Sequence, residues 1–180
     1  MTERRVIVGV SGSLASLAAL REAVAVARST GSGLTAVHAW EMPEGRAHAA
    51  RHPDRAWARH RAHAAQRRLD RAFEEALGGQ PEGVRVRRLV VRGRAGAVLR
   101  DAAAGEGRLL VIGARAKARW APVRWYVERF APCPVVTAAP PSVPRRARRV
   151  VRRAAVADFV VARPGRAGAP EGLVQGPPGP

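Results

Sequence analysis

Short runs of aliphatic residues alternate with amphipathic segments along most of this chain. Two runs, residues 6–10 and 109–112, are continuously apolar, as is typical of strands that are buried on both faces of a parallel sheet. The other runs that we interpret as strands are residues 34–40, 84–91 and 133–138. Arg85 and Arg87 alternate with apolar residues, which predicts that one face of this strand is exposed at an edge of the sheet.

The segment after the first strand repeats its apolar residues with the period of an α-helix. These residues fall on one narrow arc, and they are Leu17, Leu20, Val24 and Ala27. We expect a serine, Ser11 or Ser13, to cap the start of this helix, and Gly31 to end it.

Three further segments have the same helical period. The longest is residues 54–77, and its apolar stripe consists of Ala58, Ala62, Ala65, Leu69, Ala72 and Ala76. Shorter helices are predicted over residues 95–104 and 123–130. Strands and helices therefore alternate, which predicts an α/β fold with a five-stranded parallel, doubly wound sheet and helices on both faces.

The composition changes at Pro140, where the alternating pattern ends. Residues 139–180 contain eight arginines and two acidic residues, and they are rich in proline and glycine. Such a segment buries too little apolar area to offset the entropy lost on ordering. We therefore expect one α/β domain over residues 4–139 and a basic, disordered tail over residues 140–180, with at most a short helix within residues 145–162.

The chain is strongly basic, but almost all of its positive charge comes from arginine. The formal net charge is +18, and Lys117 is the single lysine among 32 basic residues. This bias, together with abundant alanine, glycine and proline, is typical of a GC-rich genome. It weakens the usual inference from basic charge to nucleic acid. Binding of nucleic acid or of an acidic partner through the tail stays open as an alternative.

The cysteine and hydropathy patterns indicate the compartment. Cys133 is the only cysteine, so an intramolecular disulfide is impossible. No apolar segment reaches the ~18 residues that a transmembrane helix needs. We expect a cytoplasmic protein with no membrane partner.

Three blocks of the sequence resemble the universal stress protein family. They are residues 6–13, residues 91–99, and residues 110–115 followed by Ala131-Pro132-Cys133-Pro134-Val135-Val136, the last being the most specific. The resemblance covers residues 4–139. It implies the sheet order 3-2-1-4-5 and a homodimer that pairs through the final strand. In some members it also implies ATP bound where strands 1 and 4 part.

The resemblance implies which positions a nucleotide would contact, and they are Ser11, Val37, Gly113, Arg115 and Ala116. In members that bind ATP, an acid follows the first strand and contacts the nucleoside. A Gly-x-x-Gly loop after the fourth strand, with a later Gly-Ser or Gly-Thr at a helix start, cradles phosphate with backbone N–H groups.

This chain departs from that pattern at nearly every functional position. Ser11 stands in place of the acid, and Ala116 in place of the second glycine. Ala121 and Pro122 stand where Gly-Ser is expected, and proline has no N–H to offer a phosphate. The loop before them is also shorter than in the family. We therefore expect no cofactor, and in particular no ATP bound in the family's manner.

Several single residues have both a chemical and a structural interpretation. Four histidines have a spacing that would suit a metal site, and they are His48, His52, His60 and His63. Because arginines surround them, we favour the interpretation that they are solvated and bind no metal. The turn Gly9–Ser13 lacks the second glycine of a nucleophile elbow and has no matching base, so we expect no enzyme. His38 is expected to be packed, and Cys133 to be buried and inert.

Three functions remain from the sequence. The first, which we favour, is a non-enzymatic universal stress protein-like domain in stress response that lacks the usual ATP site. The second is a nucleotide-binding signalling module with a modified site, in which Arg115, Lys117 and Arg119 replace glycine amides. The third is an electrostatic nucleic-acid binder that works through the tail.

Overall fold

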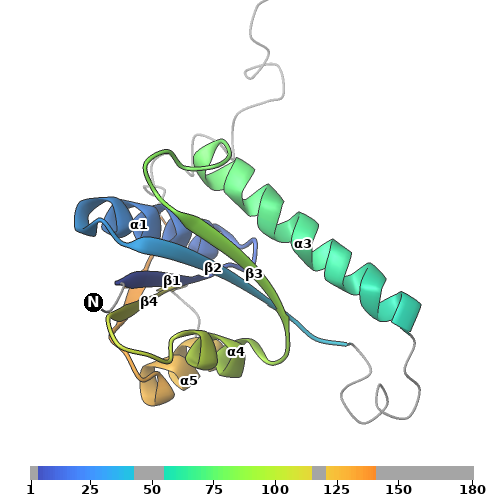
Figure 1. Ribbon diagram of the computed structural model, residues 1–180. Helices are drawn as coiled ribbons and strands as arrows, with labels where there is room; N and C mark the ends of the chain where they lie inside the picture. Colours follow the sequence, from blue (N-terminus) through green and yellow to red (C-terminus); the bar gives the residue numbers. More distant parts are fainter. Residues whose placement is uncertain (1–3, 43–54, 115–120, 141–180) are drawn as a thin grey trace, which may run out of the picture. The chain divides into compact units, whose positions relative to one another are not determined.

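The computed structural model describes residues 4–42, 55–114 and 121–140, and Figure 1 shows their arrangement. Its strands are β1 (Arg5–Gly9), β2 (Gly33–Trp40), β3 (Val86–Arg92), β4 (Arg108–Gly113) and β5 (Val135–Ala138). They form one sheet in the order β3-β2-β1-β4-β5, and all neighbouring pairs are parallel. The expected α/β class and strand order are confirmed.

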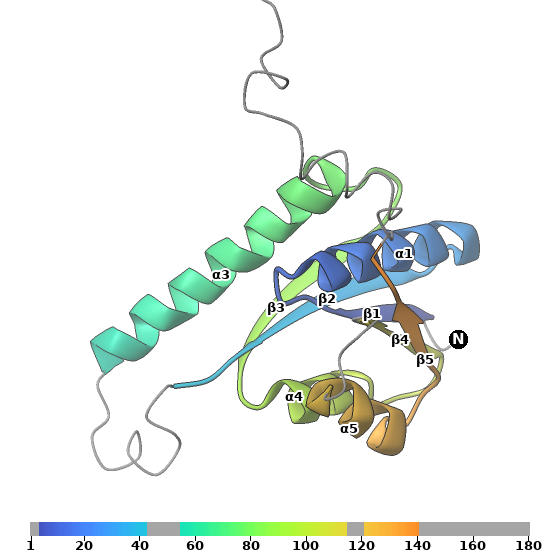
Figure 2. The same cartoon turned by 180° about the vertical axis from the view of Figure 1, so that it is seen from behind.

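Helices cover both faces of this sheet. They are α1 (Leu14–Thr30), α3 (Arg55–Leu77), α4 (Ala95–Ala102) and α5 (Pro122–Phe130). Figures 1 and 2 show α1 and α3 on one face, and α4 and α5 on the other. Within the described ranges, no helix is both long and apolar enough to cross a membrane. The segment 43–54 and the predicted tail beyond Pro140 lie outside the described residues.

The side chains of β1 explain why its sequence is continuously apolar. Val6 and Val8 pack in the core under α1 and α3, while Ile7 packs in the core under α4 and α5. All three are at most 2% exposed. Because successive side chains of a strand point to opposite faces, a strand covered on both sides needs apolar residues at every position.

Local sequence signals set the two ends of α1 as predicted. Ser13 is the N-cap, and its hydroxyl accepts a hydrogen bond from the backbone N–H of Ser16 at 3.3 Å. Gly31 ends the helix with a φ of 63°, a left-handed conformation that glycine adopts without steric cost. The four residues of the predicted apolar arc are buried.

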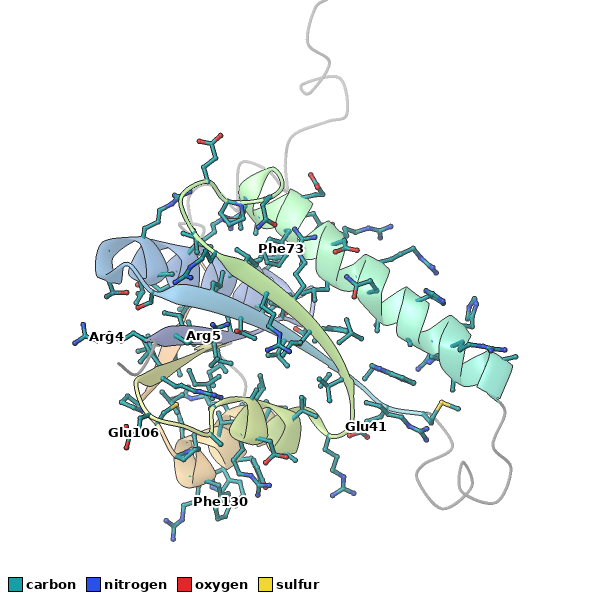
Figure 3. The ribbon with its side chains drawn as sticks, viewed as in Figure 1. Arg4, Arg5, Glu41, Phe73, Glu106 and Phe130 are labelled. Carbon is teal, nitrogen blue, oxygen red and sulfur yellow. The ribbon has the colours of Figure 1, made fainter. Side chains whose placement is uncertain are left out.

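The core-facing stripe of α3 is shorter than its sequence predicts. Ala65 and Ala72 are buried, but Ala58 and Ala62, nearer the start of the helix, are only half-buried. Phe73, which the stripe omits, is fully buried and points from α3 toward the sheet (Figure 3). The second half of α3 therefore carries the packing, and the first half projects beyond it.

Candidate functional site

A cavity of about 350 Å³ opens at the carboxyl ends of the central strands, where β1 and β4 part. This is the topological switch point at which open α/β sheets bind ligands. The residues that line it are Gly9, Val10, Ser11, Ser13, Ala15, Ser16, Val37, Ala39, Ala95, Leu99, Ile112, Gly113, Ala121, Pro122, Val123 and Arg124. Three of the predicted site positions, Ser11, Val37 and Gly113, are thus brought together.

Two predicted site residues, Arg115 and Ala116, lie outside the described residues. Lys117 and Arg119, expected beside them, do as well. Arg124 is a lining residue that the sequence reasoning missed. The signal for it was present, because Arg124 lies two residues after Pro122, in the first turn of the last helix.

The three serines at the mouth of the cavity bond to one another and to the start of α1. The Ser11 hydroxyl donates to the Ser13 hydroxyl at 3.1 Å, and the Ser16 hydroxyl donates to the Ser13 carbonyl at 2.9 Å. Among the described lining residues there is no histidine and no carboxylate. These serines therefore have a capping role and lack the base that a serine nucleophile needs.

Gly113 has a packing reason that is independent of any ligand. A Cβ at this position would lie 2.4 Å from the backbone carbon and oxygen of Ala15 and 2.7 Å from the nitrogen of Ser16. These are backbone atoms, which cannot swing aside as the end of a side chain does. The end of β4 therefore touches the first turn of α1, and only glycine permits that approach.

The start of α5 presents fewer hydrogen-bond donors to an anion than the family pattern does. Ala121 occupies the N-cap and makes no side-chain hydrogen bond there, and Pro122 lies within the first helical positions. Proline removes one of the N–H groups that a helix N-terminus can present. Arg124 brings a positive charge to the wall, but its Nε donates to Oε1 of Glu128 at 2.7 Å, so a carboxylate already neutralises much of that charge.

The remaining chemical candidates lie outside this cavity. His38 is buried, and its Nδ1 lies 2.7 Å from the carbonyl oxygen of Val10, which is the packed role that we expected. His60 and His63 are exposed on α3, whereas His48 and His52 lie outside the described residues. In the part of the chain that the structure describes, no group of His, Cys, Asp or Glu is arranged to hold a metal.

Cys133 is half-buried rather than fully buried as expected. Its thiol lies 3.5 Å from the carbonyl oxygen of Pro134. Burial raises the pKa of this thiol above its usual value, although a backbone hydrogen bond from Leu110 and the charge of Arg108 oppose the shift. The neutral thiol is therefore favoured, and the thiolate that reacts with electrophiles is disfavoured.

Similarity to solved structures supports the fold. A universal stress protein, UspA from Lactobacillus plantarum, superposes with a TM-score of 0.56 at 20% identity over 77% of this chain and 99% of that chain. The hypothetical protein MJ0577 superposes with a TM-score of 0.59 at 14% identity over 79% of this chain and 100% of that chain. No curated protein matches the sequence.

A family model covers most of the described chain. Residues 3–138 match the model of the universal stress protein family. That span begins before β1 and ends at the last residue of β5, so it contains the whole sheet and the cavity at its switch point. The chain therefore belongs to the universal stress protein family.

Proposed function

We propose that this chain is a cytoplasmic, non-enzymatic universal stress protein domain in stress response that does not bind ATP in the manner of the nucleotide-binding members. The observation that supports this proposal most is the wall of the switch-point cavity. Its polar described groups are the three serines and Arg124, with no carboxylate to accept hydrogen bonds from a nucleoside. Hydrogen bonds to a charged group contribute roughly 1.5–3 kcal/mol each, so the loss of that acceptor weakens binding substantially.

The phosphate end of the cavity supports the same proposal. Pro122 removes an N–H at the start of α5, and the glycine at the end of β4 is already required by its contact with Ala15. The missing carboxylate and the missing N–H together correspond to about two to four orders of magnitude in affinity. The absence of a histidine or carboxylate beside the serines is the reason for proposing a protein without catalytic activity.

Isothermal titration of the full chain with ATP at physiological salt tests the proposal. We expect either no heat or a weak, salt-sensitive signal that ATP, GTP and inorganic tripolyphosphate share. A micromolar, adenine-specific dissociation constant would contradict the proposal and favour the modified nucleotide site. In that case Arg124→Gln should weaken ATP binding, because Arg124 is the charged side chain in the described wall.

We also propose a homodimer that pairs through β5. The support is the position of this strand at the end of the sheet, with Val136 38% exposed and no charged residue in the strand. An open apolar edge presents unpaired backbone groups to a second strand.

A further inference from the structure

Positive and negative charges are separated along α3 and the strand beside it. Residues 55–69 and 83–100 contain eleven arginines and no Asp or Glu, whereas residues 70–82 contain one arginine and four acidic residues. A genome-wide preference for arginine accounts for the total number of arginines. It does not explain why acidic residues are missing from one half of a single helix, so this distribution has a separate cause.

The basic half of α3 also runs against the preference of an isolated helix. Its first turn contains no acidic residue, although negative charge there would favour the helix dipole. The arginines of this half are mostly exposed, including Arg59, Arg67 and Arg68. Positive charge at the amino end of the helix therefore does not serve helix stability.

Two tryptophans lie among these arginines, and each has a guanidinium over its ring. The Cζ atom of Arg61 lies 4.9 Å from the ring centre of Trp57, and that of Arg92 lies 5.8 Å from the ring centre of Trp40. We call Trp40, Trp57, Arg61 and Arg92 the tryptophan–arginine surface. Trp57 is 37% exposed, and Arg92 is exposed.

The tertiary structure joins these residues from three elements. Arg61 on α3 donates a hydrogen bond to the backbone carbonyl of Glu41, which follows β2, at 3.4 Å. Trp40 and Arg92 are register partners at the ends of β2 and β3. Figure 3 shows Glu41 at this end of β2, on the side where the first half of α3 lies. The surface is therefore held on rigid elements, and no described carboxylate pairs with Arg61 or Arg92.

We propose that this surface binds single-stranded nucleic acid. Arginine guanidinium groups match phosphate oxygens, and partly exposed tryptophan rings offer faces on which bases stack. Duplex DNA lacks splayed bases, so it would use the arginines but not the rings. The site lies on the opposite side of the sheet from α4 and α5, and it belongs to the folded domain rather than to the tail.

Fluorescence anisotropy of the full chain with a labelled oligothymidine strand, at several salt concentrations, tests this proposal. The double variant R61Q/R92Q should weaken binding roughly 20-fold at about 0.1 M salt, and it should reduce the salt slope by about 1.4, because each lost phosphate contact removes about 0.7. The matched control is R4Q/R129Q, two exposed arginines outside both this surface and the cavity, and Arg129 also lies over an aromatic ring, Phe130, at 5.8 Å. The control should change binding much less.

The tryptophan is tested separately from the charge. W57A should weaken binding roughly tenfold with an unchanged salt slope, because stacking releases no counterions, and W57F should restore most of the affinity. Circular dichroism confirms that each variant is folded. Equal losses in both arginine doubles would overturn the proposal, as would duplex binding that is at least as tight and insensitive to W57A. Binding to phosphatidylserine vesicles that oligothymidine does not displace would also overturn it.

Discussion

At the scale of single residues, two positions have a structural role that differs from their role in the family pattern. Gly113 matches the first glycine of a phosphate loop in sequence, but its contact with Ala15 requires glycine whether or not a ligand binds. Ser11 was expected at the position of a nucleoside-binding acid, and here its hydroxyl bonds to that of Ser13 at the start of α1. The capping role of the serines follows from local sequence, but the role of Gly113 does not, because it depends on which helix end meets which strand end.

Replacing Gly113 by alanine should therefore destabilise the domain itself. The added Cβ would meet backbone atoms of α1 at 2.4 Å, and overpacking of this kind costs about 1–3 kcal/mol. Gly9→Ala is the matched control, because a Cβ at that neighbouring strand end would meet the flexible end of Leu99 at 2.9 Å. Urea denaturation followed by circular dichroism should show the larger loss for Gly113→Ala. Equal losses would mean that α1 shifts easily.

Cys133 should react slowly with alkylating reagents in the folded chain. Burial raises the pKa of its thiol, so at a pH near the usual thiol pKa the folded chain holds less thiolate than the unfolded chain does. The rate of iodoacetamide labelling should therefore begin to rise at a higher pH in native buffer than in denaturant. The sign for stability follows, because the unfolded state loses its proton first and folding stability falls as pH rises through that range. Identical pH profiles in the two conditions would contradict this.

At the scale of elements, the period of the apolar residues predicted which segments are helices, but not how far each one is covered. In α3 the alanine stripe is continuous in sequence, yet only its second half packs on the core. Alanine contributes little apolar area, so the contacts of larger residues decide where the helix sits. Phe73 and its partner Arg88 supply such a contact between α3 and β3.

Arg88→Ala should loosen α3 from the sheet edge. The Arg88 guanidinium lies 4.0 Å from the ring centre of Phe73 and 2.7 Å from Oδ1 of Asp70. The Arg88 side chain is 27% exposed and that of Asp70 is 44% exposed, so solvent screens the ion pair in part. With the ring contact added, we expect a loss of about 1–2 kcal/mol in unfolding free energy. Arg124→Ala, which removes an exposed pair within one helix, should cost only about 0.3–0.5 kcal/mol. Thermal unfolding of both variants compares them directly, and an equal effect would assign the stability of α3 to other contacts.

At the scale of the whole molecule, the two edges of the sheet differ in what they present. β3 carries three arginines, Arg87, Arg88 and Arg92, and charged residues disfavour edge-to-edge pairing, whereas β5 is short and uncharged. The carbonyls of Pro134 and Ala138 accept hydrogen bonds from residues of β4 and the residue after it, at 3.0 and 2.8 Å. By the alternation of a strand, the backbone N–H and carbonyl of Thr137 face away from β4.

Thr137→Pro should therefore abolish the proposed homodimer without unfolding the chain. Proline removes an outward N–H that a second strand would use, but no bond to β4. Thr137→Val keeps that N–H and should stay dimeric. Light scattering at physiological salt measures the mass of each variant. A monomeric parent chain, or a Thr137→Pro variant that is still dimeric, would argue against pairing through this strand, and repulsion between chains of net charge +18 would be the first explanation to test.

The sequence alone determined the class and order of the elements in this protein. Continuous apolar runs identified buried strands, Ser13 and Gly31 marked the ends of α1, and arginines on one strand marked an edge. These signals are local, since burial period and backbone conformation are properties of neighbouring residues. Only the tertiary structure decided which distant groups meet: Gly113 against Ala15, Phe73 against Arg88, and Trp40 against Arg92. Such contacts depend on how helices cross the sheet and on how its strands pair, which no single segment encodes.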